Sequence, residues 1–283
     1  MAIQKVTVIG AGTMGNGIAH VFAQSGFAVT LVDIKDEFVK RGLGTIANNL
    51  ARQVKKGTIT EEESNVTLAR ITSSTDLASS TKNADFIIEA ATENLSLKKD
   101  IFKTLDTNAK PGVILATNTS SISVTELAAQ TSRAERVIGM HFFNPVPVMK
   151  LVEIIRAIQT TNEVFAEVRS LSEKLGKTPV EVNDFPGFVS NRILMPMINE
   201  AIYCVMEGVA KPEDIDTVMK LGMAHPMGPL ALADFIGLDV CLAIMNVLHD
   251  GFGDTKYRPC PLLKKMVAAG MLGKKSSKGF YQY

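Results

Sequence analysis

The sequence predicts an α/β fold, a doubly wound parallel sheet in the N-terminal part, followed by an all-α C-terminal domain. In the first part, short apolar runs rich in β-branched residues alternate with helix-compatible stretches, as in a parallel sheet with crossover helices. Beyond residue 185, long helical patterns replace the strand signals. A length of 283 residues also suits two domains of roughly 150 residues each. We therefore expect domains over residues 1–185 and 186–283.

The predicted sheet starts close to the N-terminus. Residues 5–9 (KVTVI) form a short β-branched run bounded by glycine, which is typical of a strand covered on both faces. Residues 16–25 follow with apolar side chains at helical spacing and stop at Gly26, so a helix is expected there. A second strand is predicted over residues 28–32. Later apolar runs, which supply further strands, cover residues 86–88, 113–116 and 137–140.

Helical patterns lie between and after these strands. Residues 36–56 and 61–69 are helix candidates and together form an insertion larger than a minimal crossover requires. Ser123-Val124-Thr125-Glu126 has the form of a capping box, so a helix should start there. In the C-terminal domain, one stripe of residues at helical spacing predicts a further helix, and Pro196 is expected to bend it. The stripe consists of Phe188, Asn191, Met195, Ile198 and Ile202.

The most apolar window of the C-terminal domain covers residues 229–248 and contains Asp234 and Asp239. In a membrane each carboxylate would cost on the order of 2.5 to 3.5 kcal/mol. We therefore interpret the window as a buried helix of a soluble protein and expect no membrane partner.

Composition excludes several function classes. The 30 basic and 29 acidic residues leave a net charge of +1, so no long-range field attracts nucleic acid or an anionic membrane. Cys204, Cys241 and Cys260 are too far apart for a redox or metal motif and odd in number. The N-terminus lacks the basic start and cleavage site of a secretory signal. We expect a cytoplasmic protein without a metal site.

A glycine-rich motif, Gly10 to Gly15, joins the first predicted strand to the first helix, and Asp33 ends the second strand. Its glycines suit a tight turn, close approach of a pyrophosphate and close packing of helix on strand, and the helix N-terminus attracts phosphate charge. Asp33 suits a ribose hydroxyl and repels a 2′-phosphate, which favours NAD over NADP. We therefore predict a Rossmann-type site; a structural turn with Asp33 as an N-cap is the alternative, and the motif alone also allows FAD. The expected contacts are Gly10, Gly12, Thr13, Met14, Gly15 and Asp33.

His141 follows a predicted strand, at the kind of strand end where doubly wound sheets bind ligands. Histidine is more often structural than catalytic, so its partner matters. Glu153 lies in the apolar run 151–155, where an unpaired carboxylate is unfavourable. Bonded to His141, it would fix the tautomer and stabilise the imidazolium formed when an alcohol is oxidised. Equally compatible with the sequence is a Glu153 paired at a solvated edge with Lys150 or Arg156.

Two polar residues are candidate substrate contacts. Ser120 follows another predicted strand and could bind a substrate oxygen, although a turn residue ahead of a capped helix is the simpler interpretation. Asn191 lies on an otherwise apolar stripe, so its amide needs a partner from the other domain, a ligand or water.

Seven segments, in this order, resemble the L-3-hydroxyacyl-CoA dehydrogenase family over nearly the whole chain. They are GAGTMGNGIA, EAATEN, NTSS, HFFNPVPVMKLVE, GFVSNRI, HPMGPLALADFIGLD and GKKSSKGFYQY. The resemblance implies that His141 is the general base, that Glu153 orients it, and that substrate is contacted by Ser120 and Asn191. It also implies NAD contacts from Asp33, Glu93, Lys98, Asn118, Ser120 and Asn144, with Lys275 near the nicotinamide ribose. Coenzyme A phosphates are expected at Lys56 and Arg52, although Asn49 stands where some members have serine.

The implied activity is reversible oxidation of (S)-3-hydroxyacyl-CoA by NAD to 3-ketoacyl-CoA, NADH and a proton. The resemblance is closest to the bacterial branch that acts on 3-hydroxybutyryl-CoA and acetoacetyl-CoA, and it implies a homodimer formed through the C-terminal domain. Two alternatives are a β-hydroxyacid dehydrogenase that uses a lysine base on a free acid and a catalytically silent, crystallin-like NAD-binding protein. Fatty-acid degradation and reductive butyrate or butanol synthesis both fit.

Overall fold

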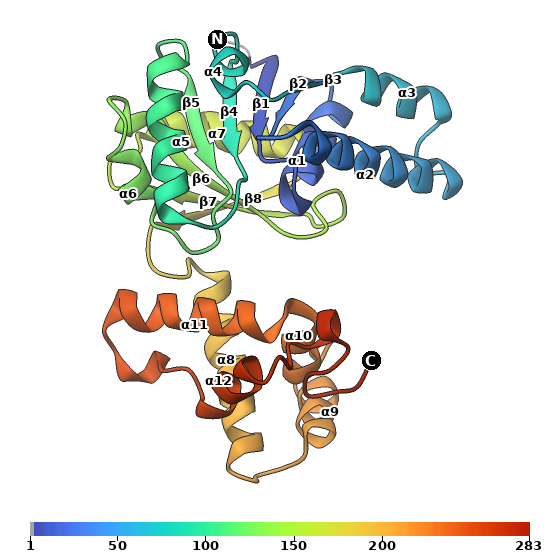
Figure 1. Cartoon of the computed structure of the whole chain (residues 1–283), viewed down its shortest axis with the longest axis vertical. Coiled ribbons are helices and arrows are strands. Elements are labelled where there is room, and N and C mark those ends of the chain that lie inside the picture. The colour runs from blue at the N-terminus through green and yellow to red at the C-terminus, as the bar shows by residue number, and fades with distance from the viewer. Residues whose placement is uncertain (1–2) are drawn as a thin grey trace. The chain divides into compact units, whose positions relative to one another are not determined.

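The computed structural model describes residues 3–283 and divides the chain into two compact units (Figure 1). The N-terminal unit ends at Asp184 and the helical unit begins at Phe185, one residue before the boundary expected from the sequence. Each unit has its own hydrophobic core. Val8 and Ile88 belong to the core of the N-terminal unit, and Ile202 to that of the helical unit.

An eight-stranded sheet organises the N-terminal unit, in the order β3-β2-β1-β4-β5-β6-β7-β8. Neighbouring strands are parallel except β6 and β7, so β7 and β8 run opposite to the other strands. The predicted doubly wound sheet is confirmed, with an antiparallel pair added. The strands are β1 (Lys5–Ile9), β2 (Ala28–Val32), β3 (Ile71–Ser74), β4 (Phe86–Glu89), β5 (Ile114–Thr117), β6 (Val137–Phe142), β7 (Leu151–Arg156) and β8 (Thr178–Asn183).

The two edge strands, β3 and β8, are absent from the strands predicted above. In β3 (ITSS) the two central residues are exposed, and in β8 only Val182 is buried. An edge strand packs against fewer neighbours and often carries polar residues or proline. Neither strand therefore has the apolar run on which the prediction relied.

Helices cover both faces of the sheet, and α2 and α3 project beside its β3 edge (Figure 1). α2 contains acidic residues in its first turn and basic residues in its last, which matches the helix dipole. Thr60 and Glu63 form a capping box at the start of α3, and Ser123 caps α6 where the sequence predicted a helix. The helices are α1 (Thr13–Gln24), α2 (Asp36–Lys55), α3 (Glu61–Ala69), α4 (Leu77–Thr81), α5 (Leu95–Asn108), α6 (Val124–Ala128) and α7 (Asn162–Lys174).

The helical unit consists of α8 (Ser190–Met206), α9 (Pro212–Gly222), α10 (Pro229–Ile236), α11 (Leu238–Phe252) and α12 (Pro261–Ala268). The predicted stripe is buried along α8, which continues through Pro196. Phe188 is also buried, but it precedes the helix with a φ of 52°, so its assignment to the helical stripe was wrong.

We expected one helix over the window 229–248, and this prediction was wrong. The window contains two helices, α10 and α11. Gly237 has a φ of 106°, a conformation that only glycine adopts readily, and this residue separates α10 from α11. In the described part of the chain no single helix is long and apolar enough to cross a membrane; α10 and α11 reach that length and composition only together, with a bend of 98° between them.

Candidate active site

The glycine motif lies between β1 and α1, where the strand order reverses between β1 and β4. Doubly wound sheets bind ligands in the crevice at such a reversal. Gly10 has a φ of 94°, and a Cβ there would lie 2.5 Å from the Ala90 carbonyl oxygen. A Cβ on Gly15 would collide with the Gly10 carbonyl oxygen, whereas one on Gly12 would meet nothing within 4 Å. Gly10 and Gly15 thus permit the close turn, while Gly12 leaves room beside the backbone for a pyrophosphate.

Asp33 follows β2 and borders the same crevice. Its carboxylate accepts hydrogen bonds from the amides of Ala11 and Ile34, both at 2.7 Å. It lines a cavity of about 500 Å³ together with Gly10 and Gly12. A helix N-terminus, a glycine turn and a carboxylate around one cavity fit the pyrophosphate and ribose of a dinucleotide. Thr13 and Met14 form the first turn of α1, directly after this glycine turn.

A buried ion pair lies where β4 ends. Lys98 of α5 is 1 % exposed, and its ammonium donates to Glu89 Oε1 at 2.6 Å and to the Ala91 carbonyl oxygen at 3.3 Å. Glu89 is fully buried and also accepts a hydrogen bond from the Thr117 hydroxyl at 2.7 Å. Lys98, expected as a cofactor contact, thus directs its ammonium to groups of the protein. Glu89 was not predicted as a site residue, because a glutamate that ends an apolar run resembles a solvated strand end until its partner is known.

The Glu93 carboxylate holds the loop that follows β5 by hydrogen bonds. Its Oε1 accepts hydrogen bonds from the amides of Ser120 and Ser121, at 2.9 and 3.1 Å, and from the Thr119 hydroxyl at 2.5 Å. Its Oε2 lies 3.4 Å from Lys98 Nζ. Burial acts to raise the pKa of Glu93, but the Lys98 ammonium and these hydrogen bonds outweigh burial and hold that pKa below its usual value. Glu93 is therefore an anion at neutral pH that positions Ser120.

His141 and Glu153 lie directly opposite each other on the antiparallel strands β6 and β7. Opposed residues share a face of the sheet, so this register alone brings the two side chains together. His141 Nδ1 and Glu153 Oε2 are 2.8 Å apart, and both residues are buried. Arg156, an alternative partner of Glu153, pairs with Glu181 at 3.0 Å. A buried carboxylate at Nδ1 fixes the position of the ring proton and stabilises an imidazolium.

Asn118 connects two strand ends next to the histidine. Its side-chain oxygen accepts a hydrogen bond from the Phe142 amide at 2.9 Å, which ties the end of β5 to the end of β6. Two other predicted site residues belong to the helical unit. Asn191 lies in the first turn of α8 and is 9 % exposed, and the Lys275 ammonium lies 2.5 Å from Asp239 Oδ1.

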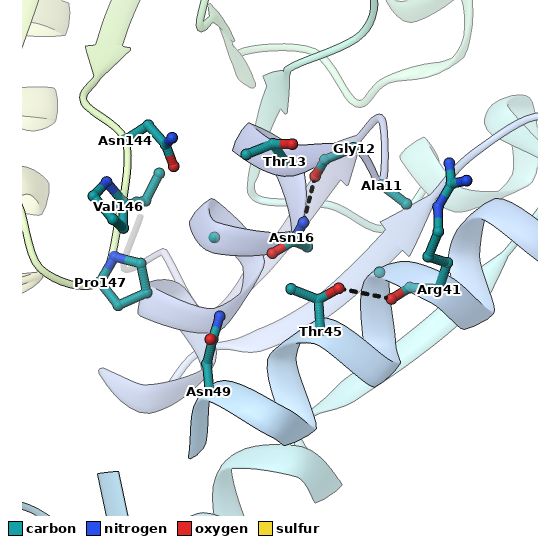
Figure 2. A pocket seen from close by; sticks show the side chains of 13 residues that line it. Ala11, Gly12, Thr13, Asn16, Arg41, Thr45, Asn49, Asn144, Val146 and Pro147 are labelled. Carbon is teal, nitrogen blue, oxygen red and sulfur yellow. Dashed lines mark hydrogen bonds between the residues drawn. The ribbon is translucent and has the colours of Figure 1, made fainter. Parts of the chain in front are cut away.

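A second cavity, of about 360 Å³, lies between α1, α2 and the turn after β6 (Figure 2). It shares Gly12 and Arg41 with the first cavity. Figure 2 shows Val146 and Pro147 of the turn on one side of Asn16 of α1, and Arg41 and Thr45 of α2 on the other. The walls are formed by Arg41, Thr45 and Asn49 of α2, by Thr13 and Asn16 of α1, and by Asn144, Val146 and Pro147 of the turn.

The predicted coenzyme A contacts lie at the end of α2, beyond this cavity. Arg52 Nη1 is 3.5 Å from the side-chain oxygen of Asn49, and Lys56 is the residue after the helix. Both side chains are solvent-accessible. The cavity and the two cations thus follow one another along the same helix.

Residues 5–185 match the family model described as 3-hydroxyacyl-CoA dehydrogenase, NAD binding domain, and residues 187–283 match its C-terminal domain. The chain belongs to the 3-hydroxyacyl-CoA dehydrogenase family. The predicted family and the predicted NAD cofactor are therefore confirmed. In the described residues no group of histidine, cysteine or carboxylate side chains could hold a metal ion.

Relatives in this family cover the whole chain. The probable 3-hydroxybutyryl-CoA dehydrogenase of Bacillus subtilis is 60 % identical over 283 residues, which are 100 % of this chain and 98 % of the relative. The 3-hydroxybutyryl-CoA dehydrogenase of Bradyrhizobium diazoefficiens is 55 % identical, over 99 % of this chain and 96 % of the relative. The crystal structure of (S)-3-hydroxybutyryl-CoA dehydrogenase from Ralstonia eutropha superposes with a TM-score of 0.97 at 55 % identity, covering 100 % of this chain and 99 % of that one.

The wall of the second cavity on α2 was not predicted, although the sequence carries a signal for it. Arg41, Thr45 and Asn49 recur every four residues and so share one helix face, where a polar stripe lies beside the buried Ile46 and Leu50. In the sequence alone, such a stripe is indistinguishable from a solvated helix face. It becomes a cavity wall only because the turn after β6 lies opposite it in the structure.

Proposed function

We propose that this chain catalyses the reversible, NAD-dependent interconversion of (S)-3-hydroxybutyryl-CoA and acetoacetyl-CoA. Family membership supports the reaction class, and relatives with this name at 55–60 % identity support a four-carbon substrate. The observation that carries the proposal is the buried pair of His141 and Glu153. It lies at the end of β6, on the same edge of the sheet as the glycine motif.

In the oxidation direction His141 accepts the C3 hydroxyl proton at Nε2 while the C3–H bond breaks and its hydrogen leaves as hydride. Nδ1 keeps its proton, and the imidazolium that forms is stabilised by the Glu153 carboxylate 2.8 Å away. In reduction the imidazolium polarises the C3 carbonyl and returns the proton. Bound NAD supplies the hydride acceptor and NADH the donor.

Ser120 and Asn191 are proposed to hold the substrate oxygen. Support for Ser120 comes from its loop, whose amides are held by the Glu93 carboxylate at 2.9 and 3.1 Å. A loop fixed in this way keeps its hydroxyl in place before substrate arrives. Asn191 is almost buried in the first turn of α8, and the family resemblance supports its role as a substrate contact. Lys275 is proposed as a cofactor contact from the same unit.

The acyl-CoA is proposed to occupy the second cavity, with its phosphates near Arg52 and Lys56. The cavity adjoins the glycine turn, so an acyl group in it would approach the cofactor site. Arg41, Arg52 and Lys56 supply positive charge along α2, which suits the phosphates of coenzyme A.

A homodimer formed through the helical unit is also proposed. α9 exposes Val218 by 61 % and Leu221 by 82 %, three residues apart on one helix face, and Met223 beyond the helix by 59 %. Exposed apolar side chains grouped on one element are typical of contact surfaces. Sedimentation equilibrium tests this proposal: a monomer at micromolar concentration would contradict it.

The test of the function is oxidation of NADH by acetoacetyl-CoA, compared with free acetoacetate and with longer 3-ketoacyl-CoA substrates. We expect turnover with acetoacetyl-CoA and little with the free acid, because the acid lacks the groups that α2 would bind. His141→Gln should lower kcat about 10²–10⁴-fold. NADH binding, measured by fluorescence, should persist in this variant. Unchanged turnover in His141→Gln would overturn the proposal.

A further inference from the structure

Lys177 is a buried cation that the proposed reaction does not use. It lies between α7 and β8 and is 8 % exposed, and burial lowers the pKa of its ammonium below the usual value. Among the described residues it forms no ion pair. Instead it donates to two carbonyl oxygens, those of Val146 at 2.6 Å and Met149 at 2.8 Å.

Both carbonyl groups belong to the turn 145–149, which connects β6 to β7. Within the turn, the amides of Val148 and Met149 both donate to the Pro145 carbonyl oxygen at 2.9 Å. The turn is therefore held by one acceptor of its own, the Pro145 carbonyl oxygen, and by one donor from outside it, the Lys177 ammonium. Burying an ammonium is unfavourable unless it is well hydrogen-bonded, and an apolar side chain of the same length would avoid that penalty. The benefit of a lysine here is its pair of charge-assisted hydrogen bonds to the turn.

The turn rests on α1 from the other side. A Cβ on Gly17 would lie 2.8 Å from the Cβ of Val146, so α1 and the turn approach closely only because residue 17 is glycine. Lys177 and Gly17 thus fix the turn from two directions. The same turn, with Asn144 just before it, forms the wall of the second cavity that faces α2, as Figure 2 shows for Val146 and Pro147.

We propose that Lys177 is a positioning residue that sets the width of the second cavity by holding the turn 145–149 against α1. The identity of the ligand, an acyl-CoA, rests on the proposed function; the effect on the turn does not. The first cavity does not include this turn, so the effect on the acyl-CoA should exceed the effect on the dinucleotide, whose predicted contacts Gly12, Thr13 and Asn144 also line the second cavity.

The test is Lys177→Met, which keeps the length of the side chain and removes its donors. We expect the KM for acetoacetyl-CoA to rise about tenfold, because a loosened wall no longer preorganises the cavity. The KM for NADH should stay within about twofold, since the first cavity is unchanged. A purely structural defect would instead lower kcat through loss of active protein and leave both KM values unchanged, and this result would overturn the proposal. The matched control is Lys150→Met, which removes an exposed lysine beside the same turn and should change neither constant.

Hydrogen exchange of the ligand-free protein separates this inference from the proposed function. The amides of Val148 and Met149 should exchange at least about tenfold faster in Lys177→Met than in the wild type, whatever the substrate is. Unchanged exchange overturns the role of Lys177 even if the enzyme is active. Faster exchange with no turnover of acetoacetyl-CoA by the wild type keeps the role and rejects the proposed function.

Lys177→Arg serves if the methionine variant does not fold. Its guanidinium keeps a charge and donors but in a different geometry, so a smaller rise in the KM for acetoacetyl-CoA is expected, with partial acceleration of the two amides. Gly17→Ala approaches the turn from α1 with Lys177 intact and should raise the same KM. Wild-type exchange and KM in both soluble variants would contradict the proposal.

Discussion

The two units of the chain bury charge for different purposes. In the N-terminal unit, two buried ion pairs join side chains near strand ends: His141 contacts Glu153, and Lys98 contacts Glu89. In the helical unit, Asp234 is fully buried and accepts hydrogen bonds from the amides of Phe280 and Tyr281 at 3.0 and 2.9 Å. It is satisfied by the backbone of the chain's own C-terminal segment.

The other buried carboxylate of the helical unit follows the same pattern. Asp216 accepts hydrogen bonds from the amides of Leu230 and Ala231, both at 2.9 Å, and from the Tyr281 hydroxyl at 2.8 Å. Backbone amides do not release protons near neutral pH, and burial together with Asp216 raises the pKa of the Tyr281 hydroxyl well above its usual value, whereas a histidine partner can exchange a proton. The comparison teaches that burial alone does not identify a catalytic carboxylate; the chemistry of its partner does.

The largest expected difference between the units concerns catalysis. Glu153→Gln keeps a hydrogen-bond acceptor but removes the charge that stabilises the imidazolium, so kcat should fall about 10²–10⁴-fold. The control is Glu181→Gln, which changes the exposed pair with Arg156 and should leave kcat within about twofold. Equal losses of kcat in steady-state assays of the two variants would show that the buried carboxylate beside His141 has no special role in catalysis.

The matching change in the helical unit is Asp234→Asn, and we expect it to act on stability. An amide cannot accept both backbone N–H groups as a carboxylate does, so the free energy of unfolding should fall by about 3 kcal/mol. Asp250→Asn, at an exposed position of the same unit, should change it by less than about 0.5 kcal/mol. Denaturant unfolding followed by circular dichroism measures both. An Asp234→Asn protein as stable as the wild type would break the contrast drawn between the units.

A buried group without catalytic use in the N-terminal unit sharpens the comparison. Burial is the main cause that lowers the pKa of His20 on α1 to about 4. The unfolded chain takes up a proton below about pH 6.5 and the folded protein only near its lower pKa, so stability is complete above pH 6.5 and declines as pH falls from 6.5 towards 4. Between pH 7 and pH 5 the expected loss from His20 is about 2 kcal/mol. His20→Leu should remove this part of the pH dependence in denaturant titrations, and an unchanged pH dependence would contradict the assignment.

The smallest expected effect concerns an exposed polar group. Thr60 accepts a hydrogen bond from the Glu63 amide at 3.1 Å at the start of α3, away from both cavities. Thr60→Ala should lower the free energy of unfolding by about 1 kcal/mol through loss of the cap, with no change in kcat. A reduced kcat in this variant would mean that α3 influences the active site. That result would contradict the distinction between exposed polar groups, which affect stability alone, and buried ones near the site.

Sequence patterns predicted those parts of the molecule that depend on neighbours along the chain. The glycine turn, its following helix and Asp33 form one local unit, and the doubly wound sheet followed from repeated apolar runs. The edge strands β3 and β8 lacked such runs, and Gly237 interrupts a window whose composition is uniformly apolar. Local periodicity contains no information about a backbone angle that one glycine adopts.

Buried charge was harder to predict, because its partners are distant in sequence. The sequence was equally compatible with Glu153 bonded to His141 and with Glu153 paired at a solvated edge. Only the register of β6 and β7 distinguishes these two interpretations. Glu89 and Lys177 were not predicted at all, since Lys177 reaches carbonyl oxygens about thirty residues earlier in the chain. The roles proposed for Ser120, Asn191 and Lys275 stay predictions.

The central claim is that His141 and Glu153 act as one proton-transferring unit. A double-mutant cycle with His141→Gln, Glu153→Gln and the combined variant, measured on kcat with acetoacetyl-CoA and NADH, tests it most directly. If the carboxylate works through the imidazole, the combined variant should be no slower than His141→Gln alone. Losses that multiply, so that the double variant is slower than His141→Gln by the full factor of Glu153→Gln, would contradict the account.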